Sequence, residues 1–106
     1  MSKTLARVKN LDQFIRKHGE DSLIAETISK MLDYKIQQYQ KEINRLNREI
    51  GKFERAHRMD SSDFYQKYLE GNLGDDLEFV EWSSLYQMRQ RLLEKKVDLK
   101  GIGVDD

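Results

Sequence analysis

The chain contains no cysteine and no proline among its 106 residues. Without cysteine it has no disulfide and no thiolate chemistry, which argues against a small secreted scaffold held together by disulfides. Without proline nothing interrupts a long helix, because proline removes a backbone N–H group and its ring clashes with the preceding turn. The composition therefore favours long helices in a protein of the cytoplasm.

The chain also lacks a long apolar run and a net charge. No segment approaches the roughly 18 apolar residues of a membrane-spanning helix, and residues 1–10 lack the apolar core of a signal peptide. With 19 basic and 19 acidic residues, the overall field does not attract the protein to nucleic acid or anionic membranes. We therefore expect a soluble cytoplasmic protein without a membrane partner.

One apolar stripe runs through the middle of the chain. Its members recur at alternating steps of four and three residues, which keeps them on one face of an α-helix. This pattern predicts a long helix that packs lengthwise against another helix. The helix-packing seam consists of Leu32, Ile36, Tyr39, Ile43, Leu46, Ile50 and Phe53, and the stripe continues to His57.

Helix start and stop signals divide the chain into four helices within a single domain. A second apolar face, which includes Phe79, Trp82 and Leu85, predicts that the last helix returns antiparallel along the long helix. The sequence therefore predicts an all-α fold, a coiled-coil-like long helical hairpin with shorter flanking helices. The expected ranges are 4–18, 22–58, 62–70 and 75–99 within the domain 1–106.

The seam has two interpretations, because either the chain's own last helix or another chain can cover it. A parallel two-stranded coiled coil is disfavoured, since Glu49 of one chain would face Glu54 of the other. A single very long helix is difficult to cover within 106 residues. We therefore expect a further interface, with a second copy in a homo-oligomer or with a different protein.

No arrangement of residues in the chain is typical of an enzyme. The two histidines, His18 and His57, are far apart, and no phosphate-binding loop, nucleophile elbow or histidine metal pair is present. Acid pairs such as Asp75 and Asp76 could hold a divalent cation, but at the start of a helix the backbone N–H groups already favour negative charge. We expect no catalytic activity, no metal and no cofactor.

Aromatic and acidic residues gather between residues 59 and 86. Residues 59–81 carry seven acidic groups and one basic group. The aromatic rings either form the core of the bundle, with the acids as helix caps, or anchor a protein interface to which the acids attract a basic partner. The candidate partner-binding residues are Phe64, Tyr65, Tyr68, Asp75, Asp76, Glu78, Glu81, Trp82 and Tyr86.

Two basic segments are candidates for binding nucleic acid. Residues 1–19 carry five basic groups and only one acidic group, Asp12. The second segment lines one face of the long helix, but the acids interspersed at positions 42, 49 and 54 weaken its attraction for phosphates. The N-terminal segment is the better candidate. The second set consists of Arg45, Arg48, Lys52, Arg55 and Arg58.

Two short motifs link the chain to a known class of proteins. The turn E-G-N-L-G-D-D at residues 70–76 and the run E-W-S-S-L-Y at residues 81–86 are the more specific of them. With these motifs, residues 53–99 resemble small helical prokaryotic proteins regarded as antitoxin components of two-gene toxin–antitoxin modules. The resemblance implies binding to a cognate toxin encoded nearby and no catalysis. The alternatives are a homodimeric helical scaffold and a nucleic-acid binder acting through residues 1–19.

Overall fold

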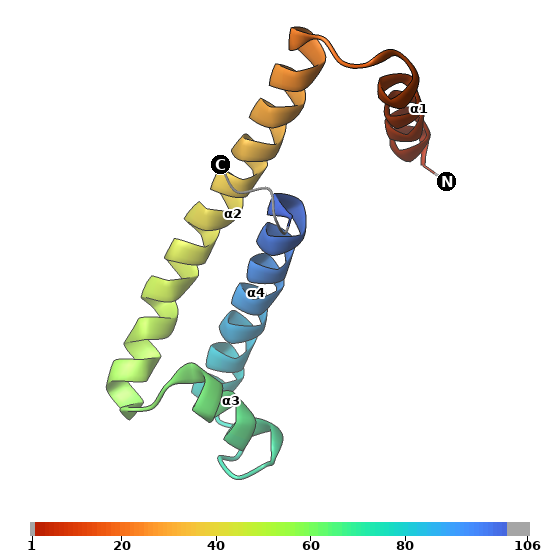
Figure 1. The fold of residues 1–106 in the computed structure, drawn as a ribbon. Helices are drawn as coiled ribbons and strands as arrows, with labels where there is room; N and C mark the ends of the chain where they lie inside the picture. The colour runs from red at the N-terminus through yellow and green to blue at the C-terminus, as the bar shows by residue number, and fades with distance from the viewer. Residues whose placement is uncertain (1, 102–106) are drawn as a thin grey trace. The chain divides into compact units, whose positions relative to one another are not determined.

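The computed structural model describes residues 2–101, which form helices and contain no strand. The predicted all-α fold is therefore confirmed. The helix bounds differ by at most two residues from the expected ranges, and the largest difference is the start of the last helix. In chain order the helices are α1 (Lys3–His18), α2 (Ser22–His57), α3 (Ser61–Leu69) and α4 (Leu77–Lys100), as labelled in Figure 1.

The chain divides into two compact units. One unit extends to Asp33 and the other begins at Tyr34. In the first unit, the Ser2 hydroxyl caps α1 by accepting a hydrogen bond of 3.0 Å from the Leu5 N–H group. None of the residues of α1, all of which are described, is buried. A helix without buried side chains gains little stability from packing, so α1 depends on its own backbone hydrogen bonds and on the Ser2 cap.

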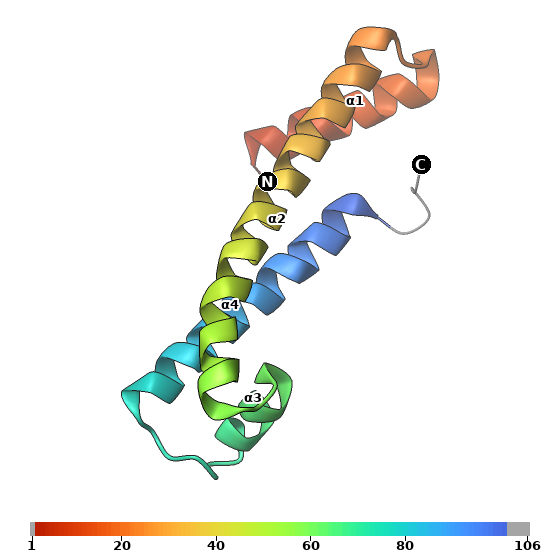
Figure 2. The ribbon, with the colours of Figure 1, turned by 90° about the vertical axis from the view of Figure 1, so that its left-hand side faces the viewer.

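In the second unit, α2 and α4 lie side by side and run antiparallel (Figures 1 and 2). Their cross-helix hydrogen bonds show the direction, because residue numbers rise along α2 as they fall along α4. Near the middle, the Arg89 guanidinium donates to the Asn47 side-chain oxygen at 3.0 Å. The ends of the paired region are marked by the contacts Gln40–Lys96 and His57–Glu78.

The core of the second unit contains the C-terminal half of the predicted seam. Ile43, Leu46 and Ile50 are buried, and the last two form one apolar cluster with Phe64 of α3 and Trp82 of α4. Complete burial of an aliphatic side chain of this size stabilises a fold by about 1.5–3 kcal/mol. The chain's own helices therefore cover this half of the seam. The other seam residues, Leu32, Ile36, Tyr39 and Phe53, are partly buried.

Helix α2 ends in a turn that usually contains glycine. Arg58, the first residue after α2, has a φ of 52°, and the Met59 N–H group donates to the Glu54 carbonyl oxygen at 3.2 Å. This six-residue bond is the mark of a Schellman C-cap, whose left-handed residue is most often glycine because it has no Cβ atom. Arg58 therefore holds a conformation that costs more for arginine than for glycine.

We expect Arg58→Gly to raise the free energy of unfolding by about 0.5–1 kcal/mol, because glycine adopts the left-handed conformation without a steric cost. Urea denaturation of the purified protein measures the change. The control is Lys52→Gly in the interior of the same helix, which we expect to lower the free energy of unfolding by about 1 kcal/mol. A loss of stability in Arg58→Gly would contradict the strained-cap interpretation.

Candidate functional site

The aromatic residues nominated from the sequence divide into a buried group and a partly exposed group. Trp82 stacks on Phe64 with ring centroids 3.7 Å apart and an angle of 6° between the rings. Phe53 and His57 also lie parallel to the indole, at 5.7 and 5.4 Å. Phe64 and Trp82 have no exposed surface. The prediction that these two side chains anchor a partner is therefore wrong for the folded chain, because the packing of α2, α3 and α4 encloses them.

A hydrogen-bond network connects the buried indole to the turn between α2 and α3. The Trp82 Nε1–H group donates to the Ser61 hydroxyl oxygen at 2.9 Å. The Ser61 hydroxyl and backbone N–H groups both donate to one Glu54 carboxylate oxygen, at 2.8 and 2.9 Å. Glu54 thus takes the role of helix cap for α3, while Asp60 stands at the N-cap position without a side-chain hydrogen bond to the helix.

The three tyrosines of the candidate set lie at the edge of this core. Tyr65 and Tyr86 contact each other across α3 and α4, with ring centroids 4.9 Å apart, and Tyr68 stacks on Phe64 at 5.6 Å. All three side chains are partly buried. They therefore keep some surface that a partner can contact, which Phe64 and Trp82 do not.

The candidate acids are all exposed, but they differ in their contacts. Glu78 is bonded to His57 at 2.8 Å and so helps to join α4 to α2. Asp76 occupies the N-cap position of α4 without a side-chain hydrogen bond to the helix, and Asp75 precedes it. Of these carboxylates, only Asp76 therefore stands at the predicted cap position, and its side chain does not bond to the helix. Asp75 and Glu81 remain exposed near the start of α4.

Sequence reasoning missed the exposed aliphatic side chains between these acids. Leu77 is 83% exposed and Val80 is 42% exposed. Together with Glu81, Ser84 and Leu85 they line a shallow, largely apolar hollow of about 430 Å³ on α4. The signal was available, because Leu77 and Val80 fall outside the helical pattern of Phe79, Trp82 and Leu85. We name the exposed surface of Asp75, Asp76, Leu77, Val80 and Glu81 the acidic–apolar surface.

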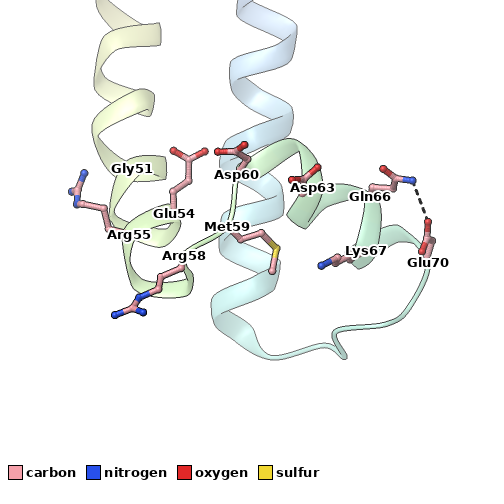
Figure 3. Close-up of a pocket in the computed structure, with 10 residues that line it drawn as sticks. All are labelled: Gly51, Glu54, Arg55, Arg58, Met59, Asp60, Asp63, Gln66, Lys67 and Glu70. Atoms are coloured by element: carbon pink, nitrogen blue, oxygen red, sulfur yellow. Dashed lines mark hydrogen bonds between the residues drawn. The ribbon is translucent and has the colours of Figure 1, made fainter.

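A larger hollow, of about 860 Å³, lies between the end of α2 and α3 (Figure 3). Arg55 of α2 and Asp63 of α3 line it, together with Arg58 and Asp60 of the connecting turn. Its charges are mixed, and its Glu54 carboxylate is already bonded to Ser61. Within residues 2–101, no group of three or more histidine, cysteine or acidic side chains is arranged to hold a metal ion.

Comparisons with known proteins identify no relative of the chain. No protein-family model, no curated protein and no solved structure matches it. Across the described helices, none is sufficiently long and apolar to cross a membrane.

Proposed function

We propose that the chain is a non-enzymatic protein-interaction module, and specifically an antitoxin-like protein that binds and neutralises a cognate toxin. The observation that carries the proposal is the acidic–apolar surface. Exposed aliphatic side chains as large as Leu77 contribute affinity when a partner covers them. The surrounding carboxylates attract a basic partner and accelerate the encounter.

The charge of this region supports a basic protein as the partner. Residues 59–81 carry a net charge of −6, although the whole chain is neutral. A toxin that acts on nucleic acid presents a basic groove to its substrate, and an acidic protein that occupies the groove blocks the reaction. The resemblance of residues 53–99 to antitoxins leads to the same proposal.

The test compares two valines of α4. Val80 belongs to the acidic–apolar surface, whereas Val97, which is 56% exposed, lies near the other end of the helix. We expect Val80→Lys to weaken binding to the product of the neighbouring gene by tenfold or more, which corresponds to about 1.4 kcal/mol. We expect Val97→Lys to change binding by less than a factor of two. Calorimetry with the purified pair measures both affinities.

Bacterial growth provides a second measurement for the same pair of variants. Expression of the neighbouring gene alone should arrest growth, and coexpression of this chain should restore it. Val97→Lys should restore growth as well as the unmodified chain does, whereas Val80→Lys should not. If the neighbouring product is harmless, the antitoxin proposal fails. If both variants bind and rescue equally, the acidic–apolar surface is not the interface.

A further inference from the structure

The outer face of α2 carries a row of basic residues. This row is separate from the acidic–apolar surface at the start of α4. Spacings of four, three, four and three residues place them on one helix face, opposite the packed seam. Each of the five is exposed. At 1.5 Å per residue the row extends about 21 Å. We name it the basic face, and it consists of Lys41, Arg45, Arg48, Lys52 and Arg55.

The sequence predicts that acids at positions 42, 49 and 54 of the same helix weaken the attraction of this face for phosphates. In the structure these acids neutralise only part of the basic face. Glu54 does not pair with a cation of the basic face, because its carboxylate is bonded to Ser61 at the start of α3. Glu42 accepts hydrogen bonds from Arg45, and these bonds lower the pKa of its carboxyl group, so that Glu42 stays charged. Glu49 lies 3.5 Å from the Lys52 amine. Glu42 is therefore paired with Arg45 and Glu49 with Lys52, while the charge of Glu49 also acts on Arg45.

Three cations of the basic face have no acidic partner among the described residues: Lys41, Arg48 and Arg55. They are seven residues apart, so they form a straight row with about 10.5 Å between neighbours. Unpaired cations at a regular spacing along a rigid helix match a ligand that carries repeated negative charge. Arginine is particularly suited to phosphate, because its guanidinium donates several hydrogen bonds in a fixed plane.

An exposed aromatic ring continues the same face. Tyr34 lies seven residues before Lys41 and is 64% exposed. It lines a groove of about 470 Å³ together with Lys41, Arg45 and Arg48, and with Glu42, whose carboxylate is bonded to Arg45. Within residues 34–57 of α2, all of which the structure describes, Tyr34 is the only large apolar side chain that is exposed. The face thus lacks the apolar centre of a protein interface but has the aromatic and cationic groups of a single-strand binding surface.

We propose that the basic face of α2 binds single-stranded nucleic acid through its phosphates, with Tyr34 stacking on an unpaired base. This site lies on the side of α2 that faces away from α4 and is independent of the acidic–apolar surface. An acidic protein fits the face less well, because its interface would need an apolar centre that the face does not offer. A duplex fits less well because its bases are already stacked.

The proposal is tested with the full chain and a fluorescent oligonucleotide of about 12 nucleotides in an anisotropy titration. We expect micromolar binding at about 50 mM salt, and three phosphate contacts predict a slope of about −2 for log affinity against log salt. The triple variant Lys41→Gln, Arg48→Gln and Arg55→Gln should weaken binding tenfold or more and flatten the salt slope. Tyr34→Ala should weaken binding about fivefold with an unchanged slope.

A matched triple variant controls for the change in net charge. Lys67→Gln, Arg91→Gln and Lys95→Gln remove the same charge from exposed positions on α3 and α4. Its affinity should stay within threefold of the unmodified chain. Equal losses in the two triple variants would overturn the proposal, as would no binding at low salt. Tighter binding of the corresponding duplex, or of polyglutamate with the same number of charges, would also overturn it. Circular dichroism verifies that the variants remain helical.

Discussion

Trp82→Ala is expected to lower the free energy of unfolding by about 4 kcal/mol, because the substitution leaves a cavity where three helices meet. The indole stacks on Phe64 at 3.7 Å and is completely buried. The substitution also removes the donor that bonds to the Ser61 hydroxyl. A domain of this size has a total stability of about 5–15 kcal/mol, so the variant should be close to unfolding at ambient temperature. Urea denaturation followed by circular dichroism measures the loss.

Trp82→Phe separates packing from hydrogen bonding at the same position. It retains an aromatic ring against Phe64 but lacks the Nε1–H group, and we expect a loss of about 1–2 kcal/mol. A different result would contradict the burial of Trp82 in the core. If Trp82→Ala unfolds no more readily than the unmodified chain and only loses affinity for a partner, the indole is an interface anchor instead.

Glu54→Ala is expected to lower the free energy of unfolding by about 2–3 kcal/mol. One carboxylate oxygen accepts hydrogen bonds from both the N–H and the hydroxyl of Ser61, which is buried. Removing the acceptor leaves two donors without a protein partner and takes a negative charge from the start of α3. Thermal denaturation and amide hydrogen exchange in residues 61–69 should both report the loss.

Glu49→Ala is the matched control for Glu54→Ala on the same helix. Glu49 forms an exposed ion pair with Lys52, and such pairs contribute little to stability. We expect a change below about 0.5 kcal/mol. Equal effects of the two substitutions would show that the Glu54 network does not hold α3 in place. Ser61→Ala should reproduce part of the Glu54→Ala loss, since it removes one of the two bonds.

The helices were predictable because hydrophobic periodicity and turn residues are local properties. The steps of three and four residues from Ile43 to Ile50 define a face, and the glycines at 71 and 74 permit the positive φ angles of the connecting turn. The apolar face around Trp82 also predicted the antiparallel return of α4. The division of the chain at Asp33 was not predictable from these patterns, because they do not say whether α1 buries anything.

The sequence predicted the acidic residues of the acidic–apolar surface but not its apolar residues. Its carboxylates were evident as a cluster of charge, but the exposure of Leu77 and Val80 depends on which side of α4 the other helices cover. The same uncertainty affected Phe64 and Trp82, which the pattern allows either in a core or at an interface. The contact from Glu54 through Ser61 to Trp82 joins residues that are 28 positions apart in the sequence. No local rule connects them.

The sequence by itself determined that this chain is helical, where each helix begins and ends to within two residues, and which face of α2 is apolar and which is basic. These properties depend on side-chain spacing and backbone preferences within a few residues. Only the tertiary structure decided that Trp82 is enclosed, that Leu77 is exposed, and that Glu54 is bonded to Ser61 at the start of α3. Burial and pairing depend on the neighbours that other helices bring, and one stretch of sequence does not contain them.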